Sequence, residues 1–209
     1  MIGADGRRGI WRHQGLNFDS PFRLGSPARE VDPPIDVVVE VLQPQTLGAP
    51  PAGSTVSELR APDRPLYSLY DTGAEFVTRA HGLCQFRADR SATRVLCEPE
   101  LGVDPAWLPV FMTGTITSLL LTLRGHAVLH GSAVTWGGTT VVFVGPTGKG
   151  KTTLAALCCA GGARFITDDV VPLARVDGAM AIVGLSSELR LRQSAGELAT
   201  LFPAGTPIR

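Results

Sequence analysis

The residues best suited to chemistry begin at position 145, where the chain has the sequence GPTGKGKT. This segment matches the pattern GxxxxGK[S/T], in which glycines let successive backbone N–H groups turn toward phosphate oxygens. In such a loop the lysine, here Lys151, reaches the β and γ phosphates, and the hydroxyl, here Thr152, binds Mg²⁺. The segment therefore predicts binding of ATP with Mg²⁺.

The flanks of the loop support this prediction. An apolar strand-like run, VVFV, precedes it, and a helix-like segment, KTTLAALCC, follows it. The alternative is a glycine-rich turn with a chance lysine, and Lys149 can simply be solvated. We assign the nucleotide contacts to the loop and the residue after it: Gly145, Pro146, Thr147, Gly148, Lys149, Gly150, Lys151, Thr152 and Thr153.

Two adjacent acids, Asp168 and Asp169, follow at the end of a predicted strand. Neighbouring carboxylates are costly to bury together unless a cation or a proton lies between them. One can hold Mg²⁺, while the other accepts the proton of an attacking hydroxyl. Neighbouring side chains of an extended segment point in opposite directions, so we expect the two acids to have different roles. The alternative is a solvated turn before VVPL.

A histidine, His130, lies in LHGSAV, on a predicted strand that leads through a hairpin to the phosphate loop. A strand histidine often serves only as a structural hydrogen-bonding group. Near the acidic pair, it would instead tune the base or carry a proton.

The overall composition excludes several classes of partner. Lys and Arg together number 19 and Asp and Glu also number 19, so no net charge attracts nucleic acid or an anionic membrane. The four cysteines show no CxxC spacing, which argues against a zinc site or a disulfide framework and favours a reducing compartment. The apolar runs are too short to span a bilayer, and the first residues have no signal-like apolar segment. We expect a soluble, cytoplasmic protein.

Three regions are predicted along the chain. Residues 1–34 are expected to be an irregular or mobile leader with at most a short strand and little of the core, because Gly, Pro, Arg and Asp dominate them. Residues 35–104 are expected to form a small β-rich region, an antiparallel meander with a loop after residue 42. Its expected strands are 35–42, 66–70, 75–82, 83–89 and 93–98. The third region, residues 105–209, is expected to be the nucleotide-binding domain.

The third region is predicted to begin with a helix over 105–124, capped by Asp104 and weakened at 113–117. Two strands joined by a Gly-Gly turn, 127–136 and 139–144, then lead to the loop. After the helix 151–160, we expect a short strand, two strands joined at an Asp-Gly turn, and a helix from Ser194. Antiparallel strands directly before a phosphate loop differ from the parallel crossover of common P-loop proteins.

Taken together, LHGSAV, VVFVGPTGKGKTTLA and GGARFITDDVVPL resemble the HPr kinase/phosphorylase family. The similarity is strongest to the HPr-kinase-like proteins of bacterial peptide-biosynthesis clusters, including those of lasso peptides, and spans roughly residues 120–175. It implies an α/β fold with a mixed sheet, as in the nucleotide-binding part of phosphoenolpyruvate carboxykinase. It also implies transfer of the γ-phosphoryl group of ATP to a serine hydroxyl of a peptide or small protein.

The resemblance also implies roles for residues. Asp168 is expected to be the catalytic base with His130 as its partner, Lys151 to act on the phosphates, and Thr152 and Asp169 to hold Mg²⁺. Glu188 is a weak further candidate for the metal-binding glutamate that the family has downstream. Members of the family usually continue beyond the position equivalent to the last residue here, so we expect a C-terminally truncated or divergent kinase domain. The β-rich region is similar to the N-terminal part of the peptide-cluster proteins, which implies acceptor recognition.

Three other functions are compatible with these residues. One is a kinase for a small-molecule hydroxyl, and another is a nucleotide-binding module that regulates a partner without transferring phosphate. The third is carboxykinase chemistry on an oxo-acid, which the lack of a further histidine or lysine cluster for a transition metal disfavours. The sequence leaves a homo-oligomer open.

Overall fold

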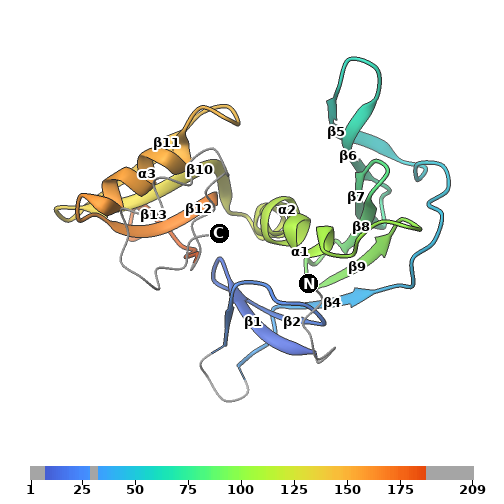
Figure 1. Cartoon of the computed structure of the whole chain (residues 1–209). Coiled ribbons are helices and arrows are strands. Elements are labelled where there is room, and N and C mark those ends of the chain that lie inside the picture. Colours follow the sequence, from blue (N-terminus) through green and yellow to red (C-terminus); the bar gives the residue numbers. More distant parts are fainter. Residues whose placement is uncertain (1–7, 29–32, 187–209) are drawn as a thin grey trace. The chain divides into compact units, whose positions relative to one another are not determined.

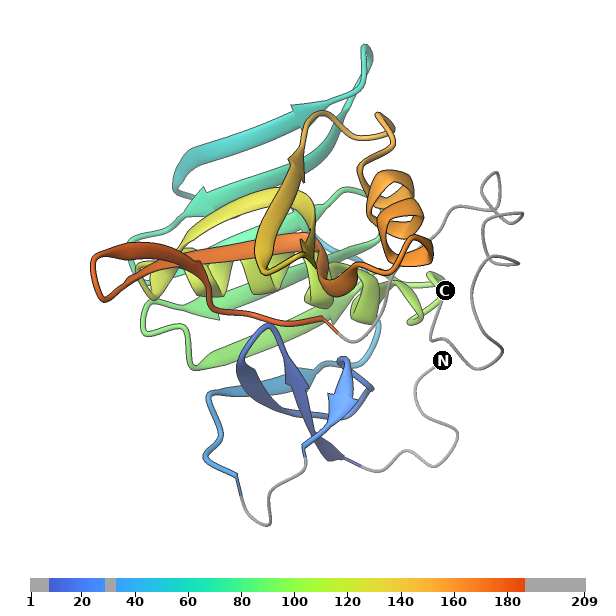
Figure 2. The same ribbon diagram turned by 90° about the vertical axis from the view of Figure 1, so that its left-hand side faces the viewer.

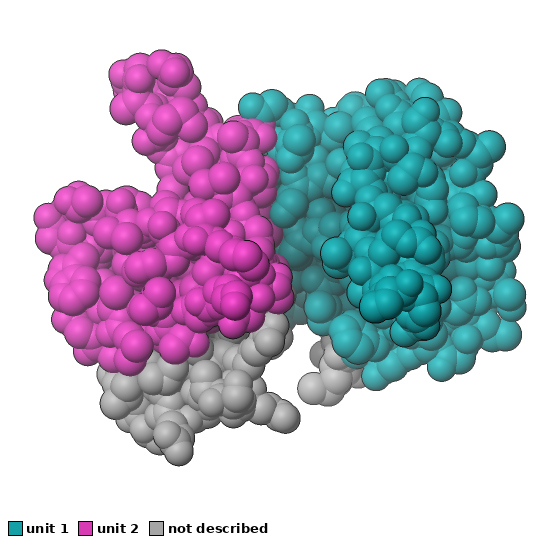
Figure 3. Space-filling model, turned by 90° about the horizontal axis from the view of Figure 1, so that it is seen from above, with its two compact units in different colours: residues 1–12, 16–125 teal, residues 13–15, 126–209 magenta. Residues whose placement is uncertain are grey.

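The computed structural model describes residues 8–28 and 33–186. The chain has a mixed α/β fold made mostly of β-sheet, and it divides into two compact units (Figure 3). Unit 1 comprises residues 1–12 and 16–125, and unit 2 comprises residues 13–15 and 126–209. Each unit is described by itself.

Unit 1 contains a nine-stranded sheet (Figure 1). Its strands are β1 (Gly9–His13), β2 (Leu16–Ser20), β3 (Ser26–Pro27), β4 (Val37–Val41), β5 (Ser54–Arg60), β6 (Pro65–Asp71), β7 (Glu75–Ala80), β8 (Cys84–Asp89) and β9 (Arg94–Pro99). They lie in the order β3-β1-β2-β4-β9-β8-β7-β6-β5. Strands β6 to β9 form the predicted antiparallel meander, and β5 adds to it by pairing antiparallel with β6. Strand β4, in contrast, pairs in parallel with both β2 and β9.

The prediction of an irregular leader is wrong for its described residues 8–28. Residues 8–28 contribute β1, β2 and β3 to the sheet, and Phe18, Phe22 and Leu24 are buried in the core. Strand β2 lies between β1 and β4 in the sheet, and its pairing with β4 joins segments that are separated in the sequence. Such a non-local pairing leaves no periodic pattern in a short, Gly- and Pro-rich segment.

Strand β5 was not predicted either. All seven of its residues are exposed, and it forms the edge of the sheet. A strand that buries neither face has no apolar alternation, so the pattern that identifies most strands is missing here.

A helical segment completes unit 1. It consists of α1 (Trp107–Phe111), the π-helical turn η1 (Met112–Ile116) and α2 (Thr117–Leu123). The π-helical turn falls where the sequence predicted a weak point. The Phe111 ring packs near Tyr67 and Phe86, and Arg124 donates to the carbonyls of Asp36 and Ala92. The segment therefore belongs with the N-terminal sheet, and the units divide after residue 125, not at the predicted boundary after 104.

Unit 2 contains a four-stranded sheet in the order β11-β10-β12-β13. Its elements are β10 (Ala127–Trp136), β11 (Thr139–Val144), α3 (Lys151–Ala160), β12 (Arg164–Val176) and β13 (Ala179–Ile182). All its described pairings are antiparallel, so the mixed sheet expected in the nucleotide-binding domain occurs instead in unit 1. The hairpin turn has Gly137 and Gly138 at φ of +56° and +80°, as predicted for a two-residue turn.

Helix α3 packs on one face of this sheet (Figure 2). Its Ala155 contributes to a buried cluster with Val134 and Ala163, and the cysteines at the end of the helix pack against the same cluster. The neighbouring strand residue Ala133 belongs to a different cluster, with Ile166 and Val171. Neighbouring residues of β10 therefore serve different cores, as strand geometry requires.

Strand β12 runs without a break through the two acids, although the sequence predicted that a strand ends before them. Strand β10 pairs with it from Ala127 to Thr135 and supplies backbone hydrogen bonds along this length. The register of this pairing shifts between Ala133 and Val134, which marks an irregularity of the ladder at that point. The helix predicted from Ser194 lies outside the described residues, and no helix in residues 8–28 and 33–186 is long and apolar enough to cross a bilayer.

Candidate functional site

The phosphate loop connects the end of β11 to the start of α3. Gly148 and Gly150 both have a φ of +81°, a conformation that glycine adopts without steric cost. The Lys149 N–H donates to the Pro146 carbonyl at 3.3 Å, which closes a tight turn with Gly148 at the position that favours a positive φ. The loop therefore contains a glycine-dependent turn, and it ends at a helix N-terminus, where backbone N–H groups have no partner within the helix.

The loop lysine is folded inward. Lys151 is buried, and its Nζ donates to the carbonyls of Gly145 at 2.8 Å and Pro146 at 3.0 Å. These two carbonyls thus accept from two of the three donors of the ammonium group. A bound phosphate oxygen would offer this buried cation a charged acceptor, which forms a stronger hydrogen bond than a neutral carbonyl does.

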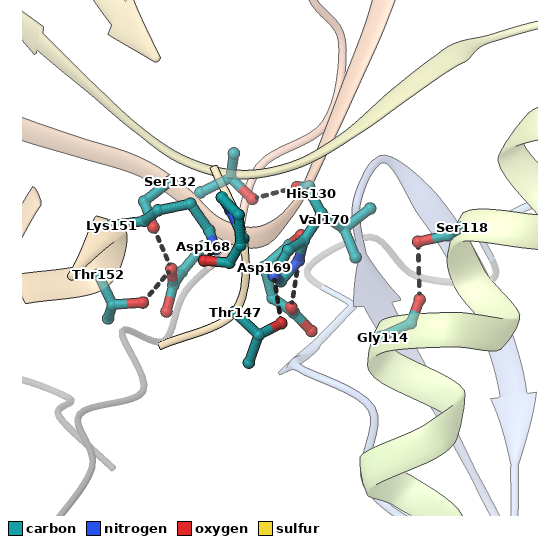
Figure 4. A network of polar contacts seen from close by, with 12 residues as sticks. Gly114, Ser118, His130, Ser132, Thr147, Lys151, Thr152, Asp168, Asp169 and Val170 are labelled. Carbon is teal, nitrogen blue, oxygen red and sulfur yellow. Dashed lines mark hydrogen bonds and ion pairs between the residues drawn. The ribbon is translucent and has the colours of Figure 1, made fainter. Parts of the chain in front are cut away.

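The first acid lies against the loop. Asp168 is buried, and its Oδ1 accepts hydrogen bonds from Thr152 Oγ1 at 2.9 Å and Ser132 Oγ at 2.5 Å (Figure 4). Ser132 is fully buried and lies directly opposite Asp168 in the β10–β12 ladder. Sheet pairing thus places the carboxylate beside the hydroxyl that the loop pattern assigns to Mg²⁺.

The second acid faces the histidine. Asp169 Oδ1 lies 3.0 Å from His130 Nδ1, and the same nitrogen lies 3.1 Å from the Asp169 carbonyl oxygen (Figure 4). The other ring nitrogen, Nε2, lies 3.4 Å from Thr147 Oγ1 of the loop. Both side chains are about half exposed, at 51% for His130 and 42% for Asp169, so both are accessible from solvent.

Asp169 has an unusual backbone conformation for a strand residue, with a φ of +71°. Non-glycine residues in this region are uncommon, and they persist where the surrounding structure holds them. Opposite it in the ladder is Gly131, where a Cβ would lie 2.7 Å from the Phe143 carbonyl oxygen. Glycine is therefore needed between His130 and Ser132, because no side chain fits between the neighbouring strands there.

The structure brings together most of the residues that the sequence singled out, but it pairs them differently. His130 was expected beside Asp168, yet it contacts Asp169. The Thr152 hydroxyl, which was expected to hold Mg²⁺ together with Asp169, contacts Asp168 instead. Ser132, opposite Asp168 in the ladder, donates to that carboxylate and holds it beside Thr152. Regular strand alternation would place Asp169 on the other face from His130, so their contact reflects the left-handed backbone of Asp169, which is not that of an extended strand.

Three further predicted residues lie apart from these contacts or outside the described residues. Lys149 is exposed on the loop, Thr153 follows Thr152 on the first turn of α3, and Glu188 lies outside the described residues. Sequence reasoning missed Ser132 as a site residue. Its position in the sequence directly after His130 and Gly131 pointed to a place near the site. Its contact with Asp168 could be assigned only from the register of β10 against β12.

Among residues 8–28 and 33–186 there is no group of three or more His, Cys, Asp or Glu side chains able to hold a metal ion. Mg²⁺ in nucleotide sites is commonly bound by one or two protein oxygens together with phosphate oxygens and water. The oxygen pair of Thr152 and Asp168 has the chemistry for that mode of binding.

Comparisons of the chain with protein-family models, with curated proteins and with solved structures found no match.

Proposed function

We propose that this chain is an ATP-dependent phosphotransferase of the HPr-kinase-like kind, which transfers the γ-phosphoryl group to a hydroxyl of a peptide or small protein. The observation that carries the proposal is the hydrogen bond between Thr152 Oγ1 and Asp168 Oδ1. It joins the phosphate loop to the acidic pair, the two parts that phosphoryl transfer needs in one place. The alternative interpretation of the acids, a solvated turn, does not explain a buried carboxylate in contact with the loop.

Thr152 and Asp168 are the residues proposed to hold Mg²⁺. Their oxygens are hard donors, and the buried carboxylate carries the negative charge that a divalent cation compensates. When bound, Mg²⁺ would neutralise charge on the phosphate oxygens. Ser132 orients the carboxylate, because its hydroxyl donates to the same oxygen atom, Oδ1.

Asp169 is proposed as the proton acceptor, with His130 as its orienting partner. This assignment exchanges the roles that the resemblance implied for the two acids. It follows the contacts, since Asp169 is the acid that meets His130 and remains half exposed. The acceptor oxygen attacks the γ-phosphorus, the bond from that phosphorus to the oxygen bridging to the β-phosphate breaks, and the hydroxyl proton passes to the Asp169 carboxylate while ADP leaves.

Lys151 is proposed to stabilise the charge that builds on the transferred group. Its two carbonyl partners keep the ammonium at the base of the loop before nucleotide binds. The choice of a serine hydroxyl on a peptide or small protein rests on the family resemblance, and the identity of the acceptor is open to screening.

The test is transfer of labelled phosphate from ATP to candidate acceptors, beginning with serine-containing peptides and continuing with small hydroxylated metabolites. Asp169→Asn is expected to abolish transfer and to leave ATP binding intact, whereas Asp168→Asn is expected to weaken the Mg²⁺ dependence of ATP binding. Label on a metabolite instead of a peptide would change the substrate class. Tight ATP binding without transfer to any acceptor would leave a nucleotide-binding module, and transfer by Asp169→Asn at the normal rate would remove that residue from the mechanism.

A further inference from the structure

A fully buried hydroxyl lies behind the acidic pair. Thr167 Oγ1 donates to the Val170 carbonyl at 2.8 Å, so this side chain bridges the backbone on both sides of Asp168 and Asp169. A threonine hydroxyl has one proton, so its second partner must be a donor. That partner is Gln14, whose Nε2 lies 2.7 Å from Thr167 Oγ1.

Gln14 is far away in the sequence but is firmly held in unit 2. Residues 13–15 belong to this unit, and Gln14 and Gly15 form the turn between β1 and β2. The Gln14 side chain is 1% exposed, its backbone N–H donates to the Leu185 carbonyl at 3.2 Å, and its φ is +51°. Gly184 packs so tightly against it that a Cβ there would lie 2.5 Å from Gln14 Oε1.

The left-handed backbone of Asp169 needs this kind of support. A strained residue persists only where its surroundings hold it. The bridge from Thr167 to Val170 supplies one such constraint, and the Gln14 amide fixes the direction of the Thr167 hydroxyl by occupying its acceptor side. With the amide removed, the hydroxyl would be free to rotate away from the Val170 carbonyl.

We propose that Gln14 is a positioning residue of the site, which acts through Thr167 to fix the backbone of Asp169 and hence the direction of its carboxylate toward His130. The proposal rests on the proposed function for its effect on catalysis. Its effect on the Asp169 backbone can be measured whether or not the chain is a kinase.

The experiment uses the full chain and substitutions that conserve volume. Gln14→Met removes the donor, Thr167→Val removes the bridging hydroxyl, and Thr167→Ser keeps that hydroxyl. The matched control is Gln85→Met in unit 1, because Gln85 is also buried and its amide donates to a side chain, Glu98. Phosphoryl transfer is measured as kcat and as KM for ATP. In parallel, the backbone amide shift and the HN–Hα coupling of Asp169 are followed by NMR of isotope-labelled protein.

Gln14→Met and Thr167→Val are expected to lower kcat by about tenfold to 100-fold, the loss that follows from misplacing a reacting group by a fraction of an ångström to an ångström. KM for ATP is expected to change by less than about twofold, because the phosphate loop is untouched. The double variant is expected to lose no more than either single variant, since both break one chain of contacts. Thr167→Ser is expected to restore kcat, and Gln85→Met to leave it unchanged.

A normal Asp169 amide shift and coupling in both Gln14→Met and Thr167→Val would overturn the proposal. So would a failure of Thr167→Ser to differ from Thr167→Val, and this pair decides the matter even where Gln14→Met fails to fold. If the unaltered chain transfers no phosphate, the proposed function fails by itself, while the NMR comparison still decides the role of Gln14.

Discussion

The left-handed backbone at Asp169 leads to a prediction in which stability and activity separate. Asn, Gly and Ala at this position all remove the carboxylate charge and its ion pair with His130. Both partners are about half exposed, so this ion pair contributes between zero and about 1 kcal/mol to the free energy of unfolding. The three variants differ in how well they tolerate a φ of +71°. Alanine in this conformation costs about 1–2 kcal/mol, whereas glycine has no such penalty and asparagine has a smaller one.

Glycine also gains freedom in the unfolded chain, which offsets about 0.4–1 kcal/mol of its advantage over alanine. The net expectation is that Asp169→Gly is more stable than Asp169→Ala by about 1 kcal/mol, with Asp169→Asn at least as stable as the glycine variant. For a chain of this size, that difference corresponds to about 2–4 °C in Tm.

The assay is thermal unfolding followed by tryptophan fluorescence in a chain that also carries Trp11→Phe and Trp107→Phe. Trp136 is then the one tryptophan left in the chain, and it lies in unit 2 on β10. All three variants at Asp169 are expected to be inactive in phosphoryl transfer. Equal stability of the alanine and glycine variants would refute the left-handed conformation, and an alanine variant more stable than both others would contradict the reasoning outright.

Three further predictions concern the loop and the strand beside it. Lys151→Met is expected to weaken ATP binding by at least about tenfold, measured by calorimetry, because it removes a charged hydrogen-bond donor to phosphate. Gly150→Ala is expected to lower the free energy of unfolding by about 1 kcal/mol, because alanine is strained at the φ of +81° found there. Gly145 has open space around it and no positive φ, so Gly145→Ala is expected to leave stability unchanged. Any loss of ATP affinity in Gly145→Ala would then report on the close approach of phosphate to the loop. Gly131→Ala is expected to lower the free energy of unfolding, measured in urea, by about 1–3 kcal/mol. The added Cβ would meet a backbone oxygen that cannot move without breaking the β10–β11 ladder. An unchanged urea midpoint would show that the strands separate freely there.

The local structure around residues 145–152 could be predicted from the sequence because it depends on short patterns. The Gly-Gly hairpin before this loop and the helix after it both occur where the residues indicated. Which acid contacts Thr152 and which contacts His130 could not be predicted, because this depends on the register of β10 against β12, and the β10–β12 ladder contains an irregularity. One position of slip exchanges the residues that face the loop.

The N-terminal region shows a different limit. Phe18 lies on β2, which pairs in parallel with β4, and Gln14 reaches Thr167 across a separation of 153 residues. No local pattern carries such information. The helical segment was predicted in type and nearly in extent, but the aromatic contacts of Phe111 that place it with the N-terminal sheet depend on packing between distant residues.

The most direct test of the account is a crystal structure of the full chain with Mg²⁺ and a non-hydrolysable ATP analogue. The account predicts that the phosphates lie on the amides of residues 145–152 and that Mg²⁺ contacts Thr152 Oγ1. The cation would replace the present hydrogen bond to Asp168 and lie next to that carboxylate, while Asp169 and His130 would face the γ-phosphate. A nucleotide bound away from the loop, or a metal ion out of reach of Asp168, would contradict it.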